Sequence, residues 1–293
     1  MKTYLDCYPC LLRQALSAAR RAGASENQQH SILLNTMEEL SASPTGFTPP
    51  QLAYRIHQRV QQLTNNIDPY REDKDQATQQ ALALYPQLKK KVSEASDPLE
   101  MAVRIAIAGN IIDLGVAESY DLEATLKRVL TQAFAINDLV PLRSTLARSK
   151  SVLYLADNAG ETVFDRVLIE SIEIPVSYVV KADPIINDAT HEDAVAAGID
   201  QVAKIIDNGS NAPGTLLDQC SELFRKRFAQ ADLIIAKGQA NYESLSDSSA
   251  PIFFLLQAKC NVIARDLGIA EGGTVLKQQE LNSCRLREIT AHS

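Results

Sequence analysis

A chain of 293 residues is long enough to fold as two ordinary domains or one large one with a sizeable core. Its 36 acidic and 29 basic residues give a net charge of -7 without a basic stripe, which argues against nucleic acid as a partner. No apolar run reaches the ~20 residues of a membrane helix, and the N-terminus lacks the pattern of a signal peptide. We therefore expect a cytoplasmic protein; the sequence does not indicate an oligomeric state.

The sequence up to about residue 148 predicts helices. Apolar residues recur three and four positions apart in stretches rich in Ala, Leu and Gln. Thr48 and Asp97 are expected N-caps because each precedes a proline that suits the first helical position. The expected helices cover 9–22, 26–41, 49–64, 71–92, 98–112 and 121–135. We expect a helical domain over residues 1–148.

Beyond residue 150 the pattern changes to short β-rich apolar runs that alternate with helical stretches, which is typical of a parallel sheet built from βαβ units. The runs are SVLYLA, PVSYVV, QVAKII, ADLIIA and PIFFLL. Their near-continuous hydrophobicity indicates strands that are covered on both faces. The predicted fold class is α/β, in which an N-terminal helical bundle packs on a Rossmann-like, mostly parallel sheet flanked by helices, with the α/β domain at 149–293.

Polar side chains that suit a metal ion follow the first two strands. Ligands of open parallel sheets bind beyond the carboxyl ends of the strands. Asp157 and Asn158 directly follow the first run, and Asp188 follows the second after a short loop. Carboxylate and amide oxygens suit a divalent ion such as Mg, Mn, Co or Ni and leave positions for water and substrate. Glu161 falls in the first turn of the next helix, where the helix dipole favours an anion.

The remaining strand ends carry groups that suit an anion. Lys237 and Lys259 follow the fourth and fifth runs, and Ser210 lies in the stretch DNGSNAPGT, whose backbone N–H groups suit an oxyanion. Carboxylates with a metal beside lysines are typical of a phosphoryl site. Each feature alone also has a structural reading, because an Asp after a strand is often an N-cap, and Thr190 to Asp193 resembles a capping box. The coincidence at five strand ends favours a functional site.

Two cysteines are spaced as a CxxC pair, Cys7 and Cys10. A structural zinc site needs four ligands and no second CxxC exists, while a redox couple is expected in a βαβ context that this helix lacks. Cys220, Cys260 or Cys284 would complete a site only through the fold. An odd number of cysteines does not form a disulfide framework, so we expect packed structural thiols.

Eight segments carry a resemblance to a known family. In chain order they are DCYPCLLRQAL, DPYREDK, AGNIIDLG, ADNAGE, PIINDAT, DNGSNAPGT, KGQANYESL and FFLLQAKCNVIA. Through them the chain resembles the metal-dependent damage-control phosphatases, catalogued as domain-of-unknown-function family 89, and their stand-alone prokaryotic-type branch with an N-terminal CxxC. The resemblance covers nearly the whole chain and implies a helical portion packed on a Rossmann-like sheet.

The resemblance also implies site roles. It implies that Asp157, Asn158 and Asp188 hold the divalent metal and that Lys259 contacts the substrate phosphate. The positions that it places along the substrate pocket are Glu161, Gln239, Ala240, Asn241 and Tyr242. Members of the family hydrolyse phosphometabolites, sugar phosphates among them. Only part of the family has the CxxC element, so no role is transferred to it.

The sequence thus predicts a divalent-metal-dependent phosphatase of small phosphorylated metabolites, in which Lys259 and Lys237 neutralise the transferring group. Specificity is expected from the helical half, around Asn110, Asp113 and Asp68. Asp157 is expected to be a ligand of the metal, although an aspartyl-phosphate nucleophile remains open. The alternatives are a nucleotide-cofactor enzyme such as a methyltransferase, for which the GxGxxG fingerprint is missing, and a non-catalytic metabolite-binding module.

Overall fold

The structure is a computed structural model that describes residues 1–44, 46–111 and 122–279. Its helices are α1 (Cys7–Arg21), α2 (Glu26–Ala42), α3 (Pro49–Thr64), α4 (Arg71–Glu94), α5 (Pro98–Ile111), α6 (Leu122–Thr131), α7 (Leu139–Leu146), α8 (Thr162–Ile169), α9 (His191–Ala196), α10 (Glu222–Ala229), α11 (Gly238–Leu245) and α12 (Asn261–Leu267). Its strands are β1 (Phe134–Asn137), β2 (Val152–Leu155), β3 (Val176–Val180), β4 (Lys204–Asp207), β5 (Ile234–Lys237), β6 (Ile252–Gln257) and β7 (Thr274–Gln278). Short 3₁₀ turns η1 (Ala159–Glu161) and η2 (Ile199–Gln201) follow β2 and α9.

Local capping sets the start of several helices. Thr48 and Gln51 form a reciprocal capping box ahead of α3, whose first residue is Pro49. The Asp97 carboxylate accepts a hydrogen bond from the Glu100 N–H at 3.1 Å and so caps α5. Both predicted N-caps are therefore confirmed, because a cap depends only on residues within one turn.

The seven strands form one sheet in the order β1-β7-β6-β5-β2-β3-β4. Strands β2 to β6 are parallel to their neighbours within this group, whereas β7 pairs with β6 in the antiparallel sense. Strand β2 lies between β3 and β5, so the chain leaves it in one direction toward β3 and β4 and returns on its other side as β5 and β6. A sheet of this kind has its ligand crevice where the strand order reverses, which here is between β2 and β5.

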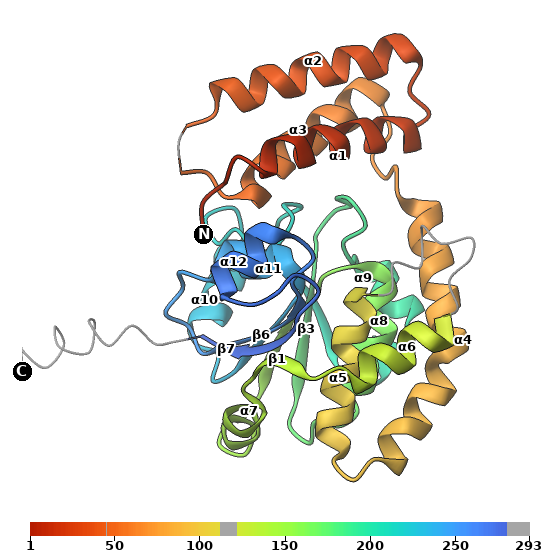
Figure 1. The fold of residues 1–293 in the computed structure, drawn as a ribbon, viewed down its shortest axis with the longest axis vertical. Helices are drawn as coiled ribbons and strands as arrows, with labels where there is room; N and C mark the ends of the chain where they lie inside the picture. The colour runs from red at the N-terminus through yellow and green to blue at the C-terminus, as the bar shows by residue number, and fades with distance from the viewer. Residues whose placement is uncertain (45, 112–121, 280–293) are drawn as a thin grey trace, which may run out of the picture.

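Helices cover both faces of the sheet, as predicted. Figure 1 shows α4, α5 and α8 on one side of it and α10, α11 and α12 on the other. Side chains of β2 alternate between the two cores: Tyr154 joins the core under α4, α5 and α8, and Leu153 and Leu155 join the core on the opposite face. No helix among the described residues is long and apolar enough to span a membrane.

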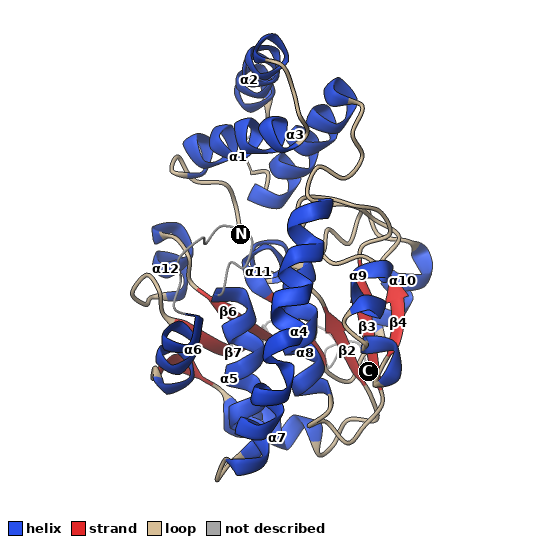
Figure 2. Cartoon of the chain, turned by 90° about the vertical axis from the view of Figure 1, so that its right-hand side faces the viewer, coloured by secondary structure: helices blue, strands red, loops and turns tan. Residues whose placement is uncertain are grey.

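Helices α1, α2 and α3 form a separate layer over the carboxyl ends of the strands (Figures 1 and 2). They pack on one another around a core of their own, to which Leu11, Ile32 and Ile56 belong. Helices α4 to α6 instead share a core with the sheet, although all of them precede residue 148. The hydrophobic cores thus separate α1–α3 from the remaining elements.

The sequence analysis did not predict two strands at one edge of the sheet, β1 and β7. The helix expected over 121–135 ends at Thr131, and Phe134–Asn137 forms β1 instead. Among the described strands, β1 pairs with β7 alone, and the sequence analysis also left β7 unassigned. Both segments are short and end in a polar residue, Asn137 or Gln278, so their β-conformation depends on pairing with distant residues rather than on local pattern.

Candidate active site

A cleft of about 680 Å³ separates the α1–α3 layer from the strand ends. Its lower wall carries Asp157, Asn158 and Asp188 from the loops after β2 and β3. Helices α1 and α3 form the opposite wall. The side walls come from α11 and from the segment after β6, which includes Lys259. The cleft therefore lies at the reversal point of the sheet and joins residues from both halves of the chain.

The turn after β2 fixes Asn158 in one orientation. The Asn158 amide nitrogen donates to Asp157 Oδ2 at 3.3 Å and to Glu161 Oε1 at 2.7 Å. Since both bonds use the nitrogen, the amide oxygen faces away from these two carboxylates. Gly160 lets α4 approach this turn, because a Cβ on Gly160 would lie 2.9 Å from the Ala77 side chain. The turn thus presents the Asn158 oxygen as a hard donor.

Backbone hydrogen bonds bring the second loop beside the first. The Ala189 N–H donates to the Asp157 carbonyl and the Ala159 N–H donates to the Asn187 carbonyl, each at 2.8 Å. Asn158 and Asp188 form an isolated antiparallel bridge. The loops are thus joined on the backbone, and Asp157, Asn158 and Asp188 lie together as the sequence analysis expected.

Asp188 carries an unsatisfied oxygen. Its Oδ2 is buried and makes no hydrogen bond with any described residue, although the Lys181 ammonium forms an ion pair with it at 3.5 Å. Burial raises the pKa of Asp188 to about 6, although Lys181 opposes the shift. A buried carboxylate oxygen that accepts no hydrogen bond is incompletely satisfied, and a closely bound cation or donor would stabilise it.

Asp157 is also a buried carboxylate. Burial raises its pKa well above the ordinary value, the charges of Glu161 and Asp188 add to the rise, and Lys259 and Lys237 oppose it. These crowded carboxylates and the Asn158 oxygen fit a divalent cation, which would favour their ionised forms. Among the described residues no three His, Cys, Asp or Glu side chains form a metal cage, so water and substrate would complete the coordination.

Lys237 ends β5 as predicted, but its side chain does not line the cleft. Its side chain is fully buried, and its ammonium lies 3.0 Å from Glu161 Oε2 and 2.6 Å from Asp165 Oδ1. Burial lowers the pKa of Lys237, but these two carboxylates outweigh that effect and the net shift is upward. Asp165 also accepts hydrogen bonds from Tyr154 and Tyr178. Lys237 therefore supports Glu161 from beneath and does not line the cleft.

Lys259 does line the cleft and is exposed in it. Its backbone N–H donates to the Gln239 side-chain oxygen at 3.3 Å. The Gln239 amide nitrogen donates in turn to Glu243 at 3.0 Å and lies 3.7 Å from the Cys260 sulfur. Gln239 thus fixes the loop that carries Lys259 to the wall formed by α11.

Three other predicted pocket residues are directed away from the cleft. Asn241 is buried and donates to the Ala156 carbonyl at 3.0 Å, which ties α11 to the residue after β2. Tyr242 donates to Asp266 at 2.7 Å on the far side of α11. Ser210 is buried and does not line the cleft. These side chains stabilise the walls of the site.

The glycine-containing loop after β4 also differs from expectation. The N–H groups of Gly209 and Ser210 donate to the side chains of Asp207 and Asn208, each at 2.9 Å, and the Ala212 N–H donates to Ser210 Oγ at 3.1 Å. These donors are occupied within the loop because Asp, Asn and Ser form local turns with their own backbone. They do not form an oxyanion cradle.

The helical positions expected to set specificity are only partly described. Asn110 lies in α5, and its side chain, like Asp113 as a whole, lies outside the described residues. Asp68 pairs with Lys74 and does not line the cleft.

Sequence analysis missed several residues of the site. Gly238 has a φ of +74°, and a Cβ there would lie 1.7 Å from Asp157 Oδ2, so only glycine leaves room for that carboxylate. Cys7 and Cys10 are half-buried in the cleft wall rather than packed in a core, which corrects their expected role. Glu243 also lines the cleft. Gly238 directly follows a predicted strand, which is a signal that the sequence contains. Cys7, Cys10 and Glu243 could be assigned to the cleft only from the tertiary structure.

Comparison with known proteins agrees with this geometry. Residues 3–275 match the sequence profile of the family described as Damage-control phosphatase ARMT1-like domain. The chain belongs to the damage-control phosphatase family. A damage-control phosphatase of Archaeoglobus fulgidus is 42% identical over 293 residues, which cover 96% of this chain and 100% of the relative. Another, of Pyrococcus horikoshii, is 34% identical and covers 94% of this chain and 97% of its own length.

A solved structure leads to the same family. The crystal structure of a family 89 protein from Pyrococcus horikoshii superposes with a TM-score of 0.89 at 32% sequence identity, covering 96% of this chain and 100% of that one. The predicted family, the α/β fold class and the assignment as a phosphatase are thereby confirmed. The damage-control phosphatase relatives disfavour the nucleotide-cofactor enzyme and the binding module.

Proposed function

We propose that this damage-control phosphatase hydrolyses small phosphate monoesters, sugar phosphates among them, with a divalent metal held by Asp157, Asn158 and Asp188. The observation that carries the proposal is the buried Asp188 Oδ2, which makes no hydrogen bond with any described residue and lies on the same cleft wall as Asp157 and Asn158. Hard oxygen donors accept Mg, Mn, Co or Ni, so the identity of the metal is set by affinity and supply.

A bound divalent metal supplies Lewis-acid polarisation of a phosphoryl oxygen. The residues of the chain then have distinct tasks. Lys259, exposed in the cleft, neutralises negative charge on the transferring group. Gln239 positions the Lys259 loop, and buried Lys237 holds Glu161, which orients Asn158. The α1–α3 layer limits access of water from above.

Asp157 acts in this proposal as a ligand and not as a nucleophile. Support comes from the position of one carboxylate oxygen: Asp157 Oδ2 faces both the Asn158 amide and the Gly238 backbone, which restricts in-line attack by this oxygen. The trapping of an aspartyl-phosphate on Asp157 by rapid acid quench and mass spectrometry would contradict this part of the proposal.

The test is release of inorganic phosphate from p-nitrophenyl phosphate and from a panel of sugar phosphates. The protein is stripped with a chelator, and Mg, Mn, Co or Ni is added back singly. We expect turnover only with metal, and a loss of about a hundredfold or more in Asp157→Asn and Asp188→Asn because each removes one ligand charge. Asp200→Asn, an exposed carboxylate outside the cleft, is the matched control and should keep wild-type rates.

Metal titration separates the outcomes. Asp188→Asn should bind Mn²⁺ more weakly in isothermal titration calorimetry while its circular dichroism stays unchanged. Full turnover by the chelator-treated wild type, or wild-type turnover by Asp188→Asn at saturating metal, would overturn the metal assignment.

A further inference from the structure

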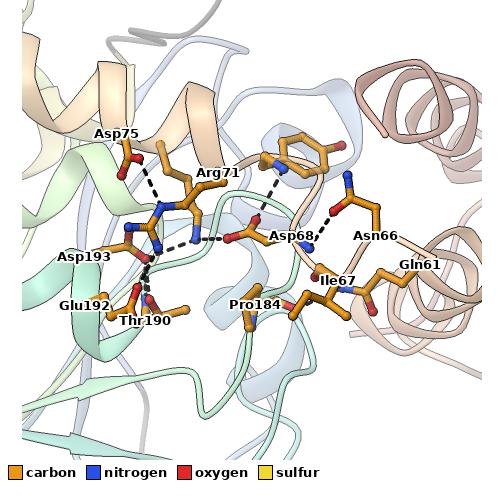
Figure 3. Close-up of polar contacts among 12 residues, drawn as sticks. Gln61, Asn66, Ile67, Asp68, Arg71, Asp75, Pro184, Thr190, Glu192 and Asp193 are labelled. Atoms are coloured by element: carbon orange, nitrogen blue, oxygen red, sulfur yellow. Dashed lines mark hydrogen bonds and ion pairs between the residues drawn. The ribbon is translucent and has the colours of Figure 1, made fainter. Parts of the chain in front are cut away.

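Lys74 is a buried charge that the proposed mechanism does not use. It lies in the first turn of α4, and its side chain is 1% exposed. Its ammonium lies 2.9 Å from Asp68 Oδ2 and 3.3 Å from Asp193 Oδ2. Asp68 and Asp193 are labelled in Figure 3. A lysine is rarely buried unless it is paired, and such pairs seldom add net stability over apolar residues of similar volume. The arrangement therefore calls for a role beyond stability.

Asp193, one partner of Lys74, connects it to the loop 181–190 between β3 and α9, which carries Asp188 and is called the metal loop below. Asp193 Oδ2, which faces Lys74, also accepts hydrogen bonds from the Thr190 N–H at 2.8 Å and the Thr190 hydroxyl at 2.6 Å. Thr190 is the N-cap of α9, and a helix of six residues has little stability of its own. Thr190 lies two residues beyond Asp188, and Ala189 between them is hydrogen-bonded to the Asp157 carbonyl.

Asp68, the other partner of Lys74, connects it to the α1–α3 layer above the cleft. Asp68 lies in the loop 65–70 that joins α3 to α4 (Figure 2). In the same loop, the Ile67 carbonyl accepts a hydrogen bond from the Gln61 side chain of α3 at 2.8 Å. The same Gln61 nitrogen donates to the Pro184 carbonyl at 3.1 Å, in the segment that leads to Asp188. Lys74 thus lies at the junction of the layer, α4 and the metal loop.

We propose that Lys74 is a positioning residue that holds the Asp188 loop in place through Asp193 and Thr190, and so keeps the proposed metal ligands together. The inference rests on the proposed function, since it assigns metal binding to Asp188. Figure 3 shows the contacts converging on Asp68, Asp193 and Thr190 from α4 and the neighbouring loops.

Arg71 offers a matched control one turn earlier on the same helix. Its guanidinium pairs with Asp75 at 3.0 Å and with Glu192 of α9 at 2.6 Å, but its side chain is 48% exposed. Arg71 therefore joins the same two helices at the surface without contacting the capping carboxylate of Asp193.

The test compares Lys74→Met with Arg71→Met at 15 °C, where folding is verified by circular dichroism. Mn²⁺ dissociation constants are measured by calorimetry with Mn²⁺ alone. Lys74→Met should weaken Mn²⁺ binding about tenfold or more, the usual effect of losing an outer partner of a metal ligand, and Arg71→Met should weaken it less than about twofold.

At saturating Mn²⁺, Lys74→Met should recover most of its kcat. A lower melting temperature with an unchanged Mn²⁺ dissociation constant would reduce Lys74 to a structural role and overturn the inference.

Two further variants complete the design. If Lys74→Met does not fold, Asp68→Asn decides the question, because it weakens the hold on Lys74 and should weaken Mn²⁺ binding about threefold. Asp188→Asn tests the proposed function separately. Strong Mn²⁺ binding that Asp188→Asn abolishes, together with wild-type binding by Lys74→Met or Asp68→Asn, refutes only the role of Lys74. An absence of Mn²⁺ binding by the wild type refutes both.

Discussion

Gly238 shows how one missing methyl group shapes the site. Its φ of +74° and the 1.7 Å between an added Cβ and Asp157 Oδ2 make the position intolerant of any side chain. We expect Gly238→Ala to displace Asp157 and weaken Mn²⁺ binding at least about tenfold, as loss of a metal-site partner does. Calorimetric titration with Mn²⁺ measures the effect.

The control is Gly268→Ala. Gly268 has a similar φ of +68° but open space where its Cβ would lie. This variant should show only the conformational cost of a positive φ, about 1 kcal/mol in the free energy of unfolding, with unchanged Mn²⁺ binding. Equal Mn²⁺ affinities for the two alanine variants would contradict the steric argument.

Glu243 provides a titratable carboxylate in the cleft wall. Burial raises its pKa to about 7, while Gln239 opposes the rise. Above pH 7 the carboxylate is ionised and repels an anionic substrate; below pH 7 it is neutral. We therefore expect KM for a phosphate monoester to increase as pH rises through 7, and this increase to be smaller in Glu243→Gln.

The comparison uses one substrate for both proteins, so the titration of the phosphate cancels. KM is measured between pH 6 and 8.5 at saturating metal. Superimposable pH profiles of KM would show that Glu243 does not face the bound substrate.

At the scale of elements, one buried network joins β2, β3, β5 and α8 beneath the site. Lys237 of β5 pairs with Asp165 of α8, which also accepts from Tyr154 and Tyr178 on β2 and β3. Removing the ammonium leaves the carboxylates of Asp165 and Glu161 buried without their cation. We expect Lys237→Met to lower the free energy of unfolding by about 3–5 kcal/mol, the usual cost of breaking a buried pair.

Urea unfolding at pH 7 measures this change. Lys226→Met, which removes an exposed pair with Glu222 on α10, is the control and should cost less than about 1 kcal/mol. A Lys237→Met variant as stable as the Lys226→Met control would show that the network contributes little.

The helices and strands of this protein differ in how well the sequence predicts them. Helix α3 was predicted with its observed bounds because Thr48, Pro49 and the apolar period all lie within the segment. Strand β1 was missed because its four residues gain a β-conformation only by pairing with β7, more than a hundred residues away along the chain. Local signals suffice for elements stabilised locally and fail at a sheet edge.

At the scale of the whole molecule, the α1–α3 layer introduces a dependence of stability on acid. His57 is buried in α3, its Nε2 has no hydrogen-bond partner among the described residues, and burial lowers its pKa to about 4. In the unfolded chain histidine binds a proton near pH 6.5, so between pH 6.5 and 4 the unfolded state binds more protons. The contribution of His57 to stability is therefore lost as pH falls through this window.

Given these two pKa values, we expect His57 to lower the free energy of unfolding by about 2 kcal/mol between pH 7 and pH 5. Urea unfolding at both pH values is measured for the wild type and for His57→Phe. The difference between the two proteins separates the contribution of His57 from that of carboxylates that titrate in the same range. An equal change in the two proteins would show that His57 is protonated in the folded state.

The sequence by itself determined which residues follow each parallel strand, because strand ends and helix starts depend on local pattern and capping. Asp157, Asn158, Asp188 and Lys259 were predicted in this way, Gln239 was implied by the family resemblance, and all five line the cleft. Their proposed roles await the experiments above.

Only the tertiary structure decided which strand-end side chains face the cleft. Lys237 follows the same rule as Lys259, yet it turns inward to carboxylates 72 and 76 residues away in the chain. Lys74 and Cys7 reach the site region from helices that precede the sheet. The direction of a charged side chain depends on the partners that offset its desolvation, and these partners meet only when the whole chain has folded.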